Sequence, residues 1–360
     1  MTTLRADAQG RPRTCPTAVE MRGAQGTTDM GASTSVPTVN TDSLAPAARI
    51  TVDSAHDMIR IIAGPYRIKG ESSHHAHDAS MGATVLRAEW PVEGWLRGYQ
   101  IVLCDADASG NEPLPRAMVH HAGLANFSRR QLVYPMIERL LAVGSETDNV
   151  MLPSGVGVPL HRGDSLGVYA GLHGLSDTVI AHAYVIVTLP WARMQRHRPI
   201  EVLPFYADVN NQIGGTTAFD VPPGTSVRSA EFTMPIGGRL LGIGGHMHDY
   251  GVALRLEDAE SGKVFARLRA QRTGDGHIRG VSRFNFGFHE DGLRLEAGHR
   301  YRIVAEYDNP TGKMLSHGGM GSIAGAFAPD DLSRWPRLDR ADADVQRDEA
   351  SLAMGDMAMP

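Results

Sequence analysis

The sequence predicts an all-β protein made of two tandem antiparallel jelly-roll β-sandwich domains. Three observations lead to this fold class. Short runs rich in Val, Ile, Leu and Tyr recur along the chain, with turn signals at spacings of roughly 8–12 residues. The 40 glycines and 21 prolines provide those turn signals. The 360 residues are enough for two hydrophobic cores of ordinary domain size.

The clearest strand signals are spread over most of the chain. They lie at residues 98–104 (GYQIVLC), 167–170, 183–189 (AYVIVTL), 239–244, 252–256 (VALRL) and 300–307 (RYRIVAEY). The partial alternation of apolar and polar residues is typical of strands with one buried face. Residues 129–143 predict a partly helical segment that Pro135 interrupts. Many short strands with little helix favour sandwiches and jelly rolls.

Shifts in composition divide the chain into four parts. Residues 1–48 predict a disordered leader, because they are rich in small and polar residues and lack a periodic apolar pattern. No basic stretch followed by an apolar run marks a signal peptide there, so the compartment stays open. The basic, strand-poor residues 193–199 predict a boundary between jelly rolls at residues 49–198 and 199–330. Residues 331–360 predict a charged, methionine-containing mobile tail.

Charge and composition disfavour several classes of protein. The chain has 35 Lys and Arg against 40 Asp and Glu and no basic stripe, so we expect no nucleic-acid partner. No apolar stretch reaches the about 18 residues of a membrane-spanning helix. Cys15 and Cys104 are too few for a disulfide framework or a cysteine-rich metal site. The 16 His and 16 Met direct attention to metal ligands instead.

The first candidate ligands are the adjacent residues His120 and His121. Neighbouring strand residues point to opposite faces, so both imidazoles reach one ion only if the strand ends or bulges there. Gly123 favours such a break. His173 follows another strand-like run and offers a third imidazole nitrogen. The histidine-rich stretch at residues 74–77, by contrast, predicts a solvated loop.

The second set of candidate ligands lies in the second predicted domain. His246 and His248 form an HxH pair, and the period of two on a strand places both on one face. The glycines before them allow close approach of other chain segments. Met320 is flanked by glycines and has little to pack against, which favours a ligand role for its thioether. Two imidazoles and one thioether form a soft donor set that suits copper in both oxidation states.

The order of these motifs resembles that of the copper type II, ascorbate-dependent monooxygenases, typified by peptidylglycine α-hydroxylating monooxygenase and dopamine β-monooxygenase. The motifs are HH, a single His after an LPxGVGxxxxxGD-type run, HxHxxG, and a Met between glycines, over residues 90–328. The resemblance implies two jelly rolls that face each other across an open cleft, with one copper on each. It assigns His120, His121 and His173 to the electron-transfer copper, and His246, His248 and Met320 to the catalytic copper that binds dioxygen.

The resemblance also implies a reaction. Two copper ions per chain, reduced by ascorbate, would activate dioxygen and hydroxylate a C–H bond of a small-molecule substrate. Peptide-hydroxylating members hold the substrate carboxylate with an arginine and a tyrosine at positions that are Gly244 and Ala324 here. A peptide ending in glycine is therefore not the expected substrate. The sequence leaves the substrate and the oligomeric state open.

Two alternative functions remain open at this point. The first is a non-catalytic copper-binding protein. The second is a cupin-like mononuclear metal oxygenase, although the nearest acids after HxH, Asp249 and Glu257, do not fit its motif. Residues 163–167 match G-x-S-x-G, but the strand-like run after them predicts a turn between strands and not the nucleophile elbow of a hydrolase.

Overall fold

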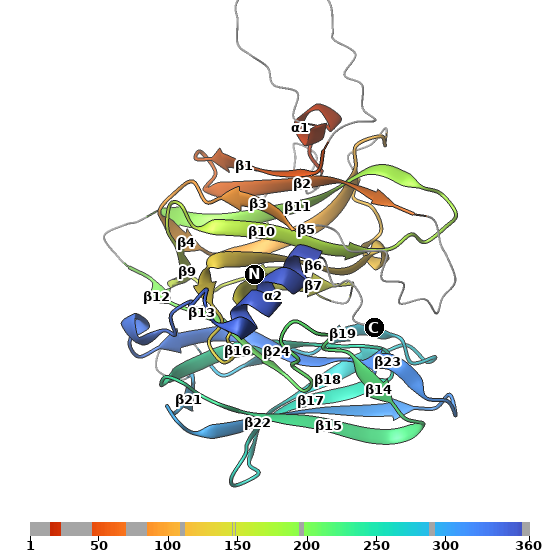
Figure 1. The fold of residues 1–360 in the computed structure, drawn as a ribbon, viewed down its shortest axis with the longest axis vertical. Coiled ribbons are helices and arrows are strands. Elements are labelled where there is room, and N and C mark those ends of the chain that lie inside the picture. The colour runs from red at the N-terminus through yellow and green to blue at the C-terminus, as the bar shows by residue number, and fades with distance from the viewer. Residues whose placement is uncertain are drawn as a thin grey trace, which may run out of the picture.

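The structure is a computed structural model, and it describes residues 15–22, 45–69, 85–108, 112–145, 147, 149–193, 198–287 and 292–354. It confirms the predicted fold class, since two antiparallel β-sandwiches follow one another along the chain (Figure 1). The strands that precede residue 194, together with the short strand Ile200–Glu201, form the upper sandwich of Figure 1, and the remaining later strands form the lower one. The histidine-rich stretch at residues 74–77 lies outside the described residues.

The first sandwich packs an eight-stranded sheet against a four-stranded sheet. The larger sheet consists of β1 (Ala47–Asp53), β2 (Met58–Ile68), β4 (Gly94–Leu96), β5 (Gly98–Asp105), β8 (Val150–Met151), β9 (Val156–Leu160), β11 (Ile180–Arg193) and β12 (Ile200–Glu201). The smaller sheet has the order β3-β10-β6-β7, with β3 (Leu86–Glu89), β10 (Ser165–Leu172), β6 (Val119–Arg130) and β7 (Ile137–Gly144). A 3-10 turn, Arg116–Met118, leads into β6.

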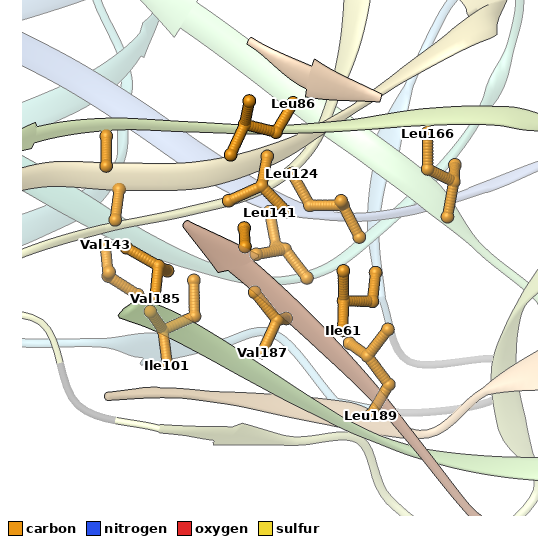
Figure 2. Close-up of a cluster of buried hydrophobic side chains, with 14 of the residues drawn as sticks. Ile61, Leu86, Ile101, Leu124, Leu141, Val143, Leu166, Val185, Val187 and Leu189 are labelled. Atoms are coloured by element: carbon orange, nitrogen blue, oxygen red, sulfur yellow. The ribbon is translucent and has the colours of Figure 1, made fainter. Parts of the chain in front are cut away.

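Alternate residues of these two sheets form the first hydrophobic core (Figure 2). Strand β11 contributes Val185, Val187 and Leu189, and the facing strands β6 and β7 contribute Leu124 and Leu141, all 7% exposed or less. Each such side chain stabilises the fold by roughly 1.5–3 kcal/mol through its removal from water. Because side chains alternate, the residues between them point to the outer faces of the sandwich.

The second sandwich also consists of packed antiparallel sheets. One sheet has β13 (Leu203–Asp208), β24 (Gly321–Pro329), β16 (Gly238–Met247), β20 (Phe284–Asn285) and β21 (Leu293–Leu295). The facing sheet has the order β15 (Gly224–Thr233), β22 (Arg300–Asn309), β17 (Gly251–Asp258), β18 (Val264–Arg272) and β19 (Ile278–Val281). Strands β14 (Phe219–Val221) and β23 (Leu315–Gly319) form a small separate ladder. Phe205, Leu254, Ile303 and Phe327 lie at the centre of the core between the sheets.

The two sandwiches are joined by an apolar junction. Leu132, in the loop between β6 and β7, is fully buried in the hydrophobic core of the second sandwich. Val156 of β9, Val202 and Leu241 of β16 form a further buried cluster across the junction. The indole N–H of Trp335 donates a 2.8 Å hydrogen bond to the Arg130 carbonyl. These contacts dock the two sandwiches on each other.

The predicted partly helical segment at residues 129–143 is wrong. These residues form the end of β6, a loop and most of β7. The apolar residues that suggested a helix are distributed between two cores, since Leu132 enters the second core while Leu140 and Leu141 enter the first. Tertiary packing has therefore overridden the local sequence pattern.

The predicted disordered leader is wrong for its described part. Helix α1 (Ala18–Arg22) lies on the outer face of the first sandwich, where Met21 packs against Ile62 and Tyr184. Cys15 forms a disulfide with Cys104 of β5, across 89 residues of sequence. The two cysteines do not make a framework of several bridges, but they fasten this segment to the sheet. The rest of residues 1–44 lies outside the described residues.

The predicted mobile tail is likewise wrong for residues up to 354. Helix α2 (Ala343–Met354) covers part of the outer face of the four-stranded sheet, beside β6 and β7 in Figure 1. Val345 and Leu352 pack against Ala125 and Phe127. The carboxylate of Asp348, only 1% exposed, accepts two hydrogen bonds of 2.7 Å from the Arg139 guanidinium and one of 2.8 Å from the Ile137 N–H.

We expect Asp348→Ala to destabilise the first sandwich strongly. Removing one partner of a buried ion pair leaves Arg139 and the Ile137 N–H without compensation, which costs about 3–5 kcal/mol. Denaturant unfolding measures this free energy. The matched control on the same helix is Asp344→Ala, whose exposed pair with Arg347 is worth less than about 1 kcal/mol. Equal losses in the two variants would contradict this role of Asp348.

Burial of Glu138 on β7 predicts a pH-dependent stability. The side chain is fully buried, and burial raises the pKa of its carboxyl to about 7 although the Arg129 guanidinium lies 3.5 Å away. The unfolded chain binds fewer protons at Glu138 than the folded chain between about pH 4.5 and 7. Stability due to this group is therefore present in full below about pH 4.5 and is lost as the pH rises to about 7.

Glu138→Gln should remove this dependence. We expect the unfolding free energy of the wild type to fall by on the order of 2–3 kcal/mol, relative to the variant, between pH 4.5 and 8. Urea unfolding at a series of pH values measures the difference. Glu112→Gln, at an exposed position, provides the control. Parallel pH profiles for the wild type and Glu138→Gln would contradict the prediction.

Candidate metal site between the two domains

His120 and His121 lie at a bulge at the start of β6. His121 pairs with Gly171 of β10 while Val119 pairs with Leu172, so His120 is the extra residue. This bulge is the break that the sequence predicted. It turns the two adjacent imidazoles to the same side, with their ring centroids 4.2 Å apart. Ala122, the next residue, points into the first core, so His121 points to the outer face of the sheet.

His246 and His248 lie at the end of β16. Met247 between them is 1% exposed and points into the second core, so both histidines point out of it. Their ring centroids are 5.2 Å apart, as the HxH spacing predicted. Gly245 allows the tight packing below them, because a Cβ there would lie 2.4 Å from a methyl carbon of Leu254.

The docking of the two sandwiches brings these pairs together. His121 Nε2 lies 3.2 Å from His246 Nε2, although 125 residues separate them in sequence. One ring nitrogen from each of His120, His121 and His248 lies within 4.8 Å of the other two. The rings of His120 and His248 have centroids 5.8 Å apart. We call His120, His121, His246 and His248 the interdomain histidine cluster. It contains two imidazoles from each sandwich.

His173 and Met320, the remaining predicted ligands, lie beside the cluster. His173 directly follows β10, its N–H donates to the Met118 carbonyl, and its ring centroid is 6.3 Å from that of His120. Met320 directly precedes β24, where the next residue pairs with Met247. The contacts of the described residues fix its backbone near His248 and give no contact of its sulfur with an imidazole.

Tyr307 of β22 fixes the backbone at this edge of the site. Its phenol oxygen accepts hydrogen bonds from the N–H of His248 at 3.1 Å and from the N–H of Met320 at 3.0 Å. The same hydroxyl donates to the Met320 carbonyl. The ring is 2% exposed, and burial raises the pKa of the phenol well above its usual value. In the sequence, the RYRIVAEY run marks Tyr307 only as a strand residue and gives no sign of this role.

A buried carboxyl on the same sheet also faces the junction. Asp208 and His246 both pair with Ser322, so the three residues form one row across β13, β24 and β16 and share a face. Asp208 accepts hydrogen bonds from the Tyr206 hydroxyl at 3.0 Å and the Asn210 N–H at 2.7 Å. Burial raises the pKa of its carboxyl to about 6. Nothing in the sequence around Asp208 marks it as a site residue.

The electrostatics of the cluster favour neutral imidazoles. Burial lowers the pKa of His121 well below its usual value, and the neighbouring His120, His246 and His248 lower it further. Burial also lowers the pKa of His173. A neutral imidazole offers one nitrogen lone pair, which is the form that binds a metal ion.

Comparison with known proteins gives similarity in fold alone. No protein-family model matches the chain, and no curated protein matches its sequence. The major capsid protein of STIV is 11% identical over 77% of this chain and 99% of its own, with a TM-score of 0.38. The major capsid protein P2 of bacteriophage PM2 is 8% identical over 74% of this chain and 98% of its own, with a TM-score of 0.37. The mavirus major capsid protein is 9% identical over 84% of this chain and 93% of its own, with a TM-score of 0.26.

This finding corrects the family assignment. The predicted membership of the copper type II, ascorbate-dependent monooxygenases is wrong: no family model and no curated protein supports it, and the similar structures include three viral major capsid proteins. The predicted C–H hydroxylation and the classification as a copper-dependent oxidoreductase are corrected with it. One fold serves many unrelated functions, so a shared jelly-roll architecture does not imply a shared reaction.

The structure also bears on membrane-spanning helices and on the G-x-S-x-G match. Among the described residues, no helix is long and apolar enough to cross a membrane. Residues 162–164 form a turn, and Ser165 to Gly167 begin β10 with no helix after them, so the G-x-S-x-G match lies at the predicted turn between strands. Strand β9 before it belongs to the larger sheet and β10 to the smaller one, so this turn connects the two layers.

We expect Tyr307→Phe to loosen the backbone of His248 and Met320. The change removes one acceptor and one donor that serve three partly buried backbone groups, at a cost of about 1–3 kcal/mol. Amide hydrogen exchange of peptides covering residues 246–250 and 318–322 should become faster. Tyr301→Phe, on the same strand, loses only the bond from the Glu296 N–H and should leave these peptides unchanged. Unchanged exchange in Tyr307→Phe would contradict the positioning role.

Proposed function

We propose that this chain is a copper-binding protein and that copper binds at the interdomain histidine cluster. The observation that supports this is the meeting of imidazoles from two separately folded sandwiches: ring nitrogens of His120, His121 and His248 lie within 4.8 Å of one another. His246 Nε2 lies 3.2 Å from His121 Nε2. Chains do not gather four histidines for packing, because imidazole buries little apolar area and repels its neighbours when protonated. A metal ion satisfies such a group of nitrogen lone pairs at once.

The donor set favours copper over other ions. Magnesium and calcium bind oxygen ligands, whereas the cluster offers nitrogen. Among divalent first-row ions, Cu(II) binds a given nitrogen site most tightly. The backbone of Met320 adjoins His248, and its thioether is the softest donor nearby, suited to Cu(I). We therefore keep copper as the proposed ion and His173 and Met320 as proposed additional ligands.

The proposal is limited to metal binding. Ascorbate and dioxygen were predicted as partners of the corrected reaction, and we do not carry them over. We take no function from the capsid proteins, because the likeness to them concerns the fold alone. That the chain has no nucleic-acid partner stays a prediction from its charge and composition. A small-molecule partner was implied only by the family resemblance, and it is not carried over.

Copper analysis of metal-free protein after reconstitution tests the proposal. We expect the wild type to retain stoichiometric copper after desalting and to bind Cu(II) more tightly than Zn(II). His120→Ala and His246→Ala should each weaken Cu(II) binding by at least about 10–100-fold, the loss typical of disturbing a metal site. His161→Ala, at an exposed position of the first sandwich, should bind as the wild type does.

Met320→Ala separates the two oxidation states. Loss of a thioether should weaken Cu(I) binding more than Cu(II) binding, measured by competition with a chelator specific for each state. Equal copper retention by the wild type and both histidine variants would contradict the proposed site. Absence of stoichiometric copper in the wild type would contradict the proposed function.

A further inference from the structure

We propose that a single metal ion is held jointly by His121 of the first sandwich and His246 of the second, and so fastens the two domains to each other. This inference rests on the proposed copper binding, and it adds where one ion lies and what it does. The resemblance described above implied a separate ion on each domain across an open cleft. In the structure a ring nitrogen of the first predicted site lies 3.2 Å from a ring nitrogen of the second.

The distance between these nitrogens fits ligands of one ion. Metal–imidazole bonds are about 2.0–2.1 Å long, so two nitrogens on one ion at angles of about 90–110° lie about 2.9–3.4 Å apart. His121 Nε2 and His246 Nε2 are 3.2 Å apart. A lone N–H···N hydrogen bond between neutral rings also fits 3.2 Å, and the experiment below distinguishes it.

The other two imidazoles lie next to this pair and offer further ring nitrogens. His120 lies beside His121 at the bulge, and His248 lies beside His246 at the end of β16. Ring nitrogens of His120, His121 and His248 are mutually within 4.8 Å, so His248 reaches the first-domain pair as well. Each domain therefore contributes two imidazoles, and neither domain alone contains more than half of the cluster.

The surrounding structure keeps both halves in place. His121 is fixed by its ladder pairing with Gly171 and Gly144, and the His248 N–H is fixed by Tyr307. Across the junction, the Tyr134 hydroxyl of the first sandwich accepts a 3.2 Å hydrogen bond from the Asp208 N–H, in the row of His246. The apolar junction therefore preforms the cluster, and the ion adds a link that exists only while both domains are folded and docked.

This arrangement couples metal binding to the stability of both domains. An ion that binds the docked state alone stabilises that state in proportion to the logarithm of its concentration over the Kd. At about 100 times the Kd of Cu(II), we expect the unfolding temperature of the full chain to rise by about 5 °C or more. The two sandwiches should then unfold in one transition.

Four variants of the full chain test the inference with Cu(II) and with redox-inert Zn(II). His121→Ala, His246→Ala and the double variant are compared with His56→Ala, which alters an exposed first-domain histidine paired with Asp53. We expect each single variant to bind Cu(II) at least about 100-fold more weakly and to lose the thermal shift. The double variant should lose no more than either single variant, because both remove the same ion.

The outcomes separate this inference from the proposed function. If each single variant loses one of two ions and keeps part of the thermal shift, and the double variant loses both, the ions are separate and the shared site is wrong. In that case copper binding stands. If the wild type binds neither metal, the 3.2 Å contact is a hydrogen bond and both proposals are wrong. Circular dichroism of the metal-free variants checks their folding, and His121→Gln and His246→Gln replace any alanine variant that fails to fold.

Discussion

The apolar junction between the sandwiches is the interaction on which the candidate site depends. Leu132 leaves the first domain and is buried in the core of the second, and Val156, Val202 and Leu241 close the junction beside it. These contacts decide which outer sheet faces meet. Without them His121 and His246, 125 residues apart in sequence, would have no reason to lie 3.2 Å from each other. The site is therefore a consequence of domain docking, and its strength follows that of the junction.

The alternation of side chains along a strand explains the arrangement of each histidine pair in the cluster. The alternation of side chains in β16 made it predictable that His246 and His248 share a face, and the buried Met247 confirms it. The need for a break at His120 and His121 was equally predictable, because a regular strand sends neighbours to opposite faces. The register shift between β6 and β10 is that break. In both cases a few residues of sequence contain all the required information.

The rest of the site depends on contacts that sequence pattern does not report. Nothing near Tyr307 reveals that its hydroxyl joins the backbones of His248 and Met320, and nothing near Asp208 reveals its place in the row of His246. Remote contacts also explain why the predicted disordered leader and the predicted mobile tail were wrong. Cys15 meets Cys104 over 89 residues, and Asp348 meets Arg139 over 209 residues. Composition predicted disorder or mobility for both ends because their stabilising partners are remote.

The family resemblance was wrong for a different reason. The motif order records which histidines follow one another along the chain, and it does not record which of them meet in space. An ordered set of strand-end ligands therefore constrains the donors available without fixing a reaction. The same donors can hold one ion together or two ions separately. In this chain the docking of the two sandwiches decides which donors meet. A 3.2 Å separation across two domains favours one shared ion. The sequence predicted two ligand sets with one ion each. With a shared ion, histidines of both sets bind the same ion, which links the two sandwiches.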